Sequence, residues 1–130
     1  IHYYFLSKGF KKIYIFNRTK KAILSKQKRT YTKKYPNADD YISDADLLIN
    51  TTPTNPITEK QTKLILKKTV VSDIVYSPRT TRFLSCFPNN KKIYGIDMLI
   101  NQAILSFEIW FGFKPVVDPS LKKKLDEKTK

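Results

Sequence analysis

Four short runs of apolar, β-forming residues divide this chain, and a segment of helical character separates each run from the next. The runs cover residues 13–16, 47–49, 70–76 and 92–94. The first reads Ile-Tyr-Ile-Phe, which is apolar at every position and is typical of a strand buried on both faces of a parallel sheet. Strands that alternate with helices predict an α/β fold built on such a sheet.

The segments between the runs have helical start and stop signals. Gly9 follows a helical segment at the position of a C-terminal cap, and Thr58 precedes another as an N-cap. Residues 39–46 are acidic and predict a turn. We predict helices over residues 1–7, 22–34, 58–68, 80–87, 97–111 and 119–130.

Residues 94–112 form the most apolar helical segment, and it contains a single glutamine, Gln102. Steps of three and four place Met98, Gln102 and Leu105 on one face, while Phe107 and Trp110 make the opposite side apolar. A helix that is apolar almost all round is normally packed between other elements, so we expect this helix to be buried. The amide of Gln102 is then either a hydrogen-bonded core group or a contact to a ligand.

The composition narrows the classes of protein that are compatible with the chain. Its 130 residues are enough for one folded domain, and 41% of them are hydrophobic. One cysteine (Cys86) and one histidine (His2) exclude a disulfide framework and an ordinary Cys/His zinc site. We find neither a secretory signal nor an apolar run long enough to span a membrane, so the cytoplasm is the expected location.

The net charge of +14 comes from 25 basic and 11 acidic residues and allows two interpretations. A nucleic-acid-binding protein gathers such charge on one face, with aromatic residues among the basic ones. Alternatively, the lysines are spread over solvated surfaces. They occur in pairs and triplets in nearly every segment, which favours the second interpretation.

Polar and turn-forming residues follow all four predicted strands. In a parallel sheet the ligand lies in the crevice outside the carboxyl ends of the strands, so these residues are candidates for a binding site. The segment after the first strand lacks an acidic residue and contains Arg18, Lys20 and Lys21. In a dinucleotide-binding fold, basic residues here select the 2′-phosphate of NADP over the 2′-hydroxyl of NAD. A solvated, basic helix start would have the same composition.

Four segments together resemble the shikimate dehydrogenases, NADP-dependent oxidoreductases that reduce 3-dehydroshikimate to shikimate in chorismate and aromatic amino-acid biosynthesis. The segments are IYIFNRTKKA, ADLLINTTP, VVSDIVYSPRTT and GIDMLINQAILSFEIWFG, and together they cover most of residues 9–116. The last two are the most particular to that family. The resemblance implies a Rossmann-like fold and a cofactor, NADP.

The resemblance also implies roles for individual residues. Tyr76 and Gln102 match the two residues through which this half of the enzyme contacts shikimate. In the family, Met98 would pack beside the nicotinamide, which Ile74 and Gly95 flank, and Thr52 would lie near the ribose and phosphates. The implied cofactor-binding residues are Asn17, Arg18, Thr19, Lys20, Lys21, Thr52, Ile74, Gly95 and Met98.

Two parts of the family's pattern are missing. None of the three glycines can form the glycine-rich turn that binds the pyrophosphate, and the strand before that turn is also absent. The fold expected is therefore an incomplete Rossmann-like, doubly wound parallel sheet with C-terminal helices. We expect residues 1–112 to be a partial NADP-binding domain and residues 113–130 a helical extension.

No segment resembles the N-terminal domain of the family, which carries a catalytic Lys–Asp pair. We therefore assign no catalytic residue and no metal ligand in this chain, and expect a C-terminal fragment that is inactive by itself. Its expected partners are the small-molecule substrate and the N-terminal domain, or a separate chain equivalent to that domain. The alternatives are a non-catalytic remnant or nucleotide-binding module and, third, a basic nucleic-acid-binding domain.

Overall fold

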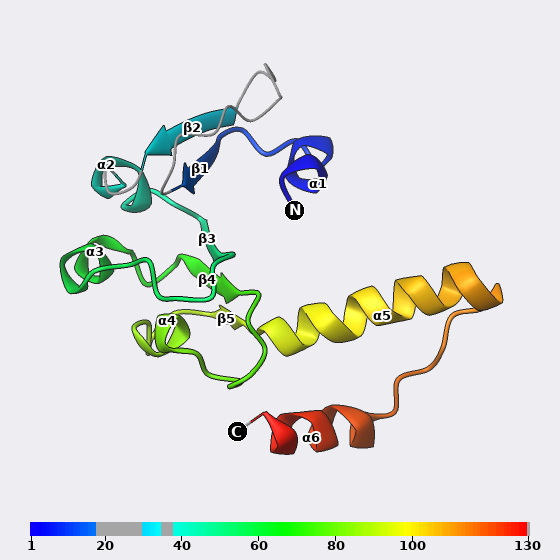
Figure 1. Ribbon diagram of the computed structural model, residues 1–130. Coiled ribbons are helices and arrows are strands. Elements are labelled where there is room, and N and C mark those ends of the chain that lie inside the picture. The colour runs from blue at the N-terminus through cyan, green and yellow to red at the C-terminus, as the bar shows by residue number, and fades with distance from the viewer. Residues whose placement is uncertain (18–29, 35–37, 130) are drawn as a thin grey trace. The chain divides into compact units, whose positions relative to one another are not determined.

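The computed structural model describes residues 1–17, 30–34 and 38–129 (Figure 1). The chain forms two compact units, Ile1–Ser43 and Asp44–Lys130. The elements of the first are α1 (His2–Ser7), β1 (Ile13–Asn17), β2 (Thr30–Lys34) and α2 (Asp39–Ile42). The second contains β3 (Leu47–Asn50), α3 (Glu59–Leu64), β4 (Val70–Asp73), α4 (Arg82–Ser85), β5 (Lys92–Ile93), α5 (Gly95–Phe111) and α6 (Pro119–Lys128).

In the first unit, β1 and β2 are paired in parallel, with register from Ile13 opposite Thr30 to Asn17 opposite Lys34. The predicted helix over residues 22–34 is wrong at its end, because residues 30–34 are a strand, whereas residues 22–29 lie outside the described part. Thr30 and Tyr31 favour extended backbone. The Tyr31 ring also stacks on that of Tyr14, with 5.2 Å between ring centres.

Two local details of this unit follow from sequence signals. Helix α1 ends in a Schellman motif at Gly9, which has φ +77° and so suits glycine. The N–H of Phe10 donates to the carbonyl of Phe5 over 3.2 Å, and their rings lie 4.6 Å apart. The predicted acidic turn over residues 39–46 contains the short helix α2, which buries Ile42.

The second unit is built on a parallel sheet in the order β3-β4-β5. Asn50 at the end of β3 is opposite Asp73 at the end of β4, and Ser72 is opposite Ile93 in β5. The predicted strand over residues 70–76 is too long, since β4 ends at Asp73. The buried side chains include Val71 of β4, Phe83, Leu84 and Phe87 in and after α4, and Ile96 of α5.

The strand connectivity has the doubly wound pattern. In that pattern the order is 3-2-1-4-5-6, and the neighbours β2-β1 and β3-β4-β5 correspond to 3-2 and 4-5-6. No strand of the described ranges takes the place of strand 1. Within those ranges β1 therefore pairs with β2 alone and β3 with β4 alone.

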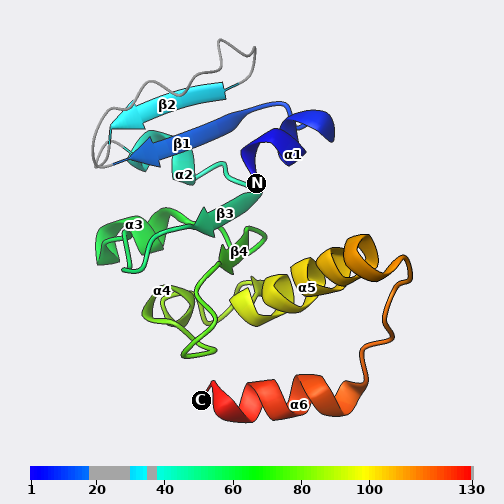
Figure 2. The ribbon, with the colours of Figure 1, turned by 45° about the vertical axis from the view of Figure 1, so that its right-hand side comes forward.

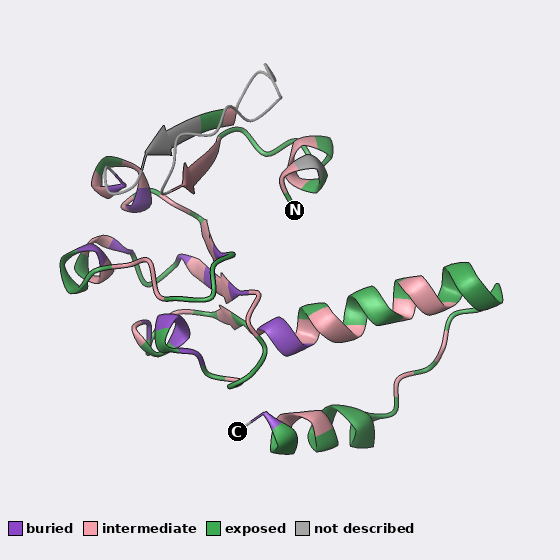
Figure 3. Cartoon of the chain, in the orientation of Figure 1, coloured by how far each residue is buried: buried purple, intermediate pink, exposed green. Residues whose placement is uncertain are grey.

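The predicted burial of the long helix is wrong. In α5 the buried residues are Gly95 and Ile96, both in the first turn, whereas Ile109 is 81% and Trp110 76% exposed. Figure 3 shows the buried class only at the start of this helix. A helix that is apolar on all sides gives no signal of which side is covered by other elements. Only the first turn of α5 is buried against the rest of the second unit. None of the described helices has both the length and the hydrophobicity needed to cross a bilayer.

Helix α6 turns back toward the start of α5 (Figures 1 and 2). Asp118 caps its N-terminus by accepting the backbone N–H of Ser120 over 2.8 Å. This hydrogen bond is the main reason why the pKa of Asp118 is lowered, and the Ser120 hydroxyl adds to the effect. Farther along α6, Lys122 and Asp126 form ion pairs with Asp97 and Arg79, which tie the helix to the rest of the second unit.

Candidate functional site

An open pocket of about 450 Å³ lies at the carboxyl ends of β3 and β4. Two segments line it, residues 51–53 after β3 and residues 74–77 after β4. The lining combines the hydroxyl groups of Thr51, Thr52, Tyr76 and Ser77 with the apolar side chains of Pro53, Ile74 and Val75. Its position is the one at which open parallel sheets bind ligands.

The first lining segment is wrapped around the buried side chain of Asn50. The amide nitrogen of Asn50 donates to the carbonyls of Thr52 (3.2 Å) and Thr54 (3.1 Å). Its amide oxygen accepts the backbone N–H of Thr52 (3.0 Å) and the Thr52 hydroxyl (2.7 Å). Asn50 thus binds polar groups on both sides of the turn and fixes the turn's conformation.

The second lining segment is held by Asp73, which is 1% exposed. One carboxylate oxygen accepts the backbone N–H of Val75 over 3.1 Å. The other accepts the Thr81 hydroxyl over 2.6 Å and the Asn50 amide over 3.2 Å. Thr81 in turn caps α4 by accepting the N–H of Leu84. The Asn50–Asp73 hydrogen bond therefore joins the two segments that line the pocket.

Asp73 was not among the predicted site residues, and Asn50 was included only as one of the polar residues that follow the second predicted strand. The signal was present, since each is a polar residue at the end of a buried apolar strand. Their pairing is a matter of register between two strands, which neither strand indicates by itself.

Helix α5 begins directly against the second lining segment. A β-carbon added to Gly95 would lie 2.4 Å from the carbonyl oxygen of Val75 and 2.6 Å from that of Ile74. Both atoms belong to the backbone, so this position accepts no side chain without a shift of one element. The structure thus brings the predicted residues Gly95 and Ile74 into close contact.

The other predicted residues have varied positions. Thr52, Ile74 and Tyr76 line the pocket, and Tyr76 is 47% exposed. Met98 and Gln102 are exposed on one face of α5, four residues apart, and do not belong to the lining among the described residues. Asn17 ends β1 in the other unit. Arg18, Thr19, Lys20 and Lys21 lie outside the described residues.

Parallel strands in this order, with a pocket at their carboxyl ends, define an α/β chain of the doubly wound, Rossmann-like class. A family model described as "Shikimate 5'-dehydrogenase C-terminal domain" matches residues 95–119. Together with relatives that align along nearly the whole chain, this match shows that the chain corresponds to the C-terminal part of the shikimate dehydrogenases.

Three similar proteins illustrate the match. The shikimate dehydrogenase (NADP(+)) of Bartonella tribocorum is 36% identical over 98% of this chain, which covers 49% of that protein. A chorismate mutase/shikimate 5-dehydrogenase fusion protein from Clostridium acetobutylicum has a TM-score of 0.74 at 25% identity, covering 98% of this chain and 49% of the other.

The third is the shikimate 5-dehydrogenase of Thermus thermophilus, solved in complex with NADP(H) and shikimate. It is 27% identical, with a TM-score of 0.58, over 76% of this chain and 39% of that one. The chain spans about half the length of the curated relatives it matches, for example 49% of the Bartonella tribocorum protein.

Proposed function

We propose that this chain is the cofactor-binding half of a shikimate dehydrogenase, which uses NADPH to reduce 3-dehydroshikimate to shikimate in chorismate biosynthesis. The observation that carries the proposal is the alignment of 98% of the chain, at 36% identity, with a shikimate dehydrogenase (NADP(+)). The pocket at the carboxyl ends of β3 and β4 supports it, because its lining comes from two of the segments that resemble the family.

The pocket fits the nicotinamide end of the cofactor, which supplies the hydride when it is bound. Ile74 offers an apolar surface to the flat nicotinamide ring. Gly95 lets the start of α5 lie directly against the backbone of Ile74 and Val75, beside the proposed ring position. We assign Met98 to the edge of the ring. The Thr52 hydroxyl has two acceptors within its own turn, the Asn50 amide oxygen (2.7 Å) and the Thr54 carbonyl (2.8 Å), so its proton stays in the turn. It therefore presents lone pairs outward, which suits a ribose hydroxyl better than a phosphate.

The adenosine end would be bound in the other unit. We assign the 2′-phosphate to Asn17 and to the basic segment Arg18, Thr19, Lys20 and Lys21 that follows it. A guanidinium group can bind a phosphate with two parallel hydrogen bonds, and the neighbouring lysines add charge. On this assignment residues 1–112 form the partial NADP-binding domain and residues 113–130 its helical extension.

Tyr76 and Gln102 are the proposed contacts to shikimate. A ligand with a carboxylate and three hydroxyls needs donors and acceptors in fixed positions, and each of these side chains offers both. The Tyr76 side chain is at the pocket and half exposed, which leaves its hydroxyl available. We expect loss of either group to weaken binding of the substrate more than binding of the cofactor.

The proton transfer requires groups from outside this chain. Among the lining residues of the described pocket there is no lysine and no carboxylate. We assign the catalytic Lys–Asp pair to an N-terminal domain or separate chain that docks on α5. An aromatic cluster at the end of that helix supports such docking, since the ring of Phe107 lies 4.4 Å from Phe111 and 5.3 Å from Phe113. The side chains of Phe111 and Phe113 are both 60% exposed, and exposed apolar groups of this kind commonly mark interfaces.

A reconstitution experiment tests the proposal. We expect the 130-residue chain alone to produce no NADPH from shikimate and NADP⁺, and turnover to appear when the N-terminal half of the Bartonella tribocorum enzyme is added. Turnover by the chain alone would contradict the assignment of the acid–base pair. Binding of NADP⁺ without turnover in the mixture would instead support a nucleotide-binding module. Binding to duplex DNA that weakens steeply with salt would support the nucleic-acid interpretation.

A further inference from the structure

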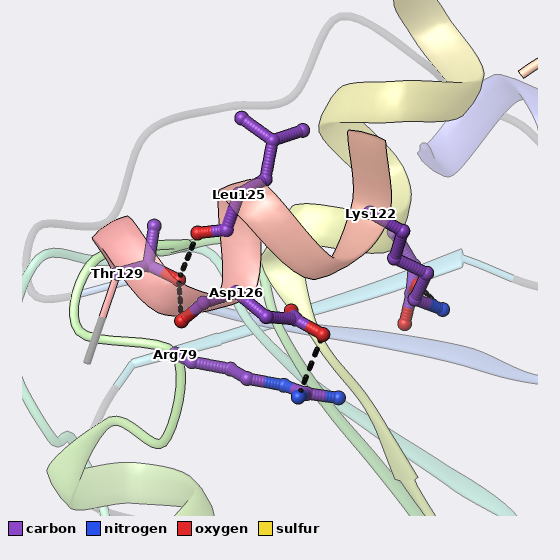
Figure 4. A network of polar contacts seen from close by, with 6 residues as sticks. Arg79, Lys122, Leu125, Asp126 and Thr129 are labelled. Atoms are coloured by element: carbon purple, nitrogen blue, oxygen red, sulfur yellow. Dashed lines mark hydrogen bonds and ion pairs between the residues drawn. The ribbon is translucent and has the colours of Figure 1, made fainter. Parts of the chain in front are cut away.

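Helix α6 bridges two segments that carry proposed ligand contacts, the segment after β4 and the first turn of α5. At the first, the Arg79 guanidinium pairs with the Asp126 carboxylate over 2.9 Å (Figure 4). The Arg79 backbone N–H also donates to the carbonyl of Thr129 over 2.6 Å. At the second, Lys122 pairs with Asp97 over 2.7 Å. One helix therefore contacts both the loop that follows the pocket lining and the first turn of α5.

Arg79 is the centre of this arrangement. It follows Ser77, the last residue of the pocket lining, by two positions. Its guanidinium carbon lies 4.7 Å from the centre of the Tyr94 ring, and Tyr94 is the N-cap residue of α5. A guanidinium group can stack on an aromatic ring and bind a carboxylate at the same time. The side chain thus links its own loop, the start of α5 and α6.

The two ion pairs differ in how far water and salt reach them. The side chains of Arg79 and Asp126 are 37% and 21% exposed, compared with 48% and 32% for Lys122 and Asp97. In addition, Nε of Arg79 and Oδ1 of Asp126 are buried and have no hydrogen-bond partner. A small rotation would let them complete a two-bond, parallel contact. The Arg79 pair is therefore the less exposed of the two, so water and salt screen it less.

We propose that Arg79 is a positioning residue: through it, α6 holds residues 74–77 and the first turn of α5 in the arrangement that binds the nicotinamide end of the cofactor. This step rests on the proposed function for the identity of the ligand. The mechanical part, that α6 restrains the segment after β4 through Arg79, rests on the contacts alone.

The test uses the full 130-residue chain and two independent measurements. Hydrogen exchange of the backbone amides of Ile74 and Val75 reports on the restraint, because both are hydrogen-bonded, to the Asn50 carbonyl and the Asp73 carboxylate. Titration with NADP⁺, followed by NMR, reports on the ligand. We expect Arg79→Gln to speed exchange at both amides about two- to fivefold, as a partly exposed ion pair allows, and to raise the Kd for NADP⁺ by a similar factor.

Matched variants separate positioning from general destabilisation. Arg82→Gln, which changes an exposed arginine on α4, should leave both measurements unchanged. Asp126→Asn removes the same ion pair from the side of α6 and should act like Arg79→Gln. The exchanged pair Arg79→Asp with Asp126→Arg should recover part of the affinity. Exchange of the Val71 amide, which is bonded to the Lys91 carbonyl inside the sheet, should remain at the wild-type rate in all variants.

Each outcome decides one of the two claims. Equal exchange at Ile74 and Val75 in Arg79→Gln and Arg82→Gln would overturn the restraint. Faster exchange with an unchanged Kd for NADP⁺ would overturn the positioning role. Faster exchange in Arg79→Gln, combined with no NADP⁺ binding by the wild-type chain, would support the restraint and overturn the proposed function.

Discussion

Replacing Asp73 by alanine should strongly destabilise the second unit. The carboxylate is 1% exposed and accepts hydrogen bonds from Val75, Thr81 and Asn50. It therefore joins the sheet, the cap of α4 and both segments that line the pocket. Alanine removes the acceptor of all three hydrogen bonds at once and leaves the buried Thr81 hydroxyl and the half-buried Val75 N–H without it.

The magnitude follows from the partners that each donor retains. The Asn50 amide nitrogen can still donate to the carbonyls of Thr52 and Thr54, so the loss of its hydrogen bond to Asp73 costs little stability. The Val75 N–H and the Thr81 hydroxyl lose the acceptor that each has at Asp73. A buried donor without a partner costs about 1–3 kcal/mol, which applies in full to the Thr81 hydroxyl; the Val75 N–H lies beside the open pocket, where water can reach it, so we expect about 2–4 kcal/mol for the two together. Whole domains are stable by only about 5–15 kcal/mol, so a loss of this size is a large fraction of the total.

Asp73→Asn should fall between wild type and Asp73→Ala. The asparagine can keep an oxygen opposite the Val75 N–H, but it then turns its own NH₂ group toward the NH₂ group of Asn50. That arrangement sets two donors against each other, and we expect it to cost about 1–3 kcal/mol. Asp46→Ala serves as the control, because Asp46 is exposed at the start of β3 and such changes usually stay within about 0.5 kcal/mol.

Urea unfolding followed by circular dichroism measures these free energies in the 130-residue chain. The expected order of stability is wild type and Asp46→Ala, then Asp73→Asn, then Asp73→Ala. If Asp73→Ala unfolds within about 0.5 kcal/mol of wild type, the buried network does not join the two lining segments and the reasoning fails.

Three further predictions concern α5 and α6. Gly95→Ala should cost about 1–3 kcal/mol in a thermal melt and weaken NADP⁺ binding, because its β-carbon would lie 2.4 Å from the Val75 carbonyl oxygen. Ser120 donates to the carboxylate of Asp118 and lowers its pKa below the ordinary value of 3.8. The cap on α6 is therefore complete above pH 3.8 and is lost as the pH falls through the lowered pKa. Helix content should fall over that range in wild type but not in Asp118→Asn. Trp110 is 76% exposed, and large exposed apolar side chains promote association, so we expect the isolated chain to self-associate in size-exclusion chromatography. Trp110→Gln should reduce that association while leaving the stability within about 0.5 kcal/mol.

Local signals in the sequence were reliable. Thr58 was predicted as an N-cap, and it accepts the N–H of Gln61 while the Gln61 side chain accepts the N–H of Thr58. Such caps involve residues three positions apart, so the sequence alone contains the whole interaction. The alternation of apolar runs with helices likewise predicted the α/β class, because parallel strands need a crossover between them.

Properties that depend on distant partners could not be predicted. Residues 30–34 follow a stretch rich in lysine with helical propensity, and pairing with β1 determines that they form a strand. The limits of α5 were predicted to within two residues, but its exposure was not. The segments that follow β3 and β4 line the pocket, where the sequence predicted a ligand crevice, whereas the hydrogen bond between Asn50 and Asp73 depends on strand register.

The two sets of contacts that hold residues 74–77 should respond differently to salt. The Asp73 hydrogen bonds are buried, and buried interactions are screened little, whereas the pairs Arg79–Asp126 and Lys122–Asp97 are partly exposed. Added salt should therefore loosen α6 first. Hydrogen exchange of the backbone amides of Leu125 and Thr129 in and after α6 should speed up with salt. Exchange of the Val75 amide, which donates to the Asp73 carboxylate, should respond less.

This salt response has a control within the chain. Salt also reduces the general repulsion expected of a net charge of +14, and that effect acts on every segment alike. Arg79→Gln has already lost the ion pair, so its α6 should exchange quickly at low salt and change less on addition of salt than wild type. An equal salt dependence in the two proteins would mean that α6 is held by packing and not by charge, and Arg79 would lose its assigned role.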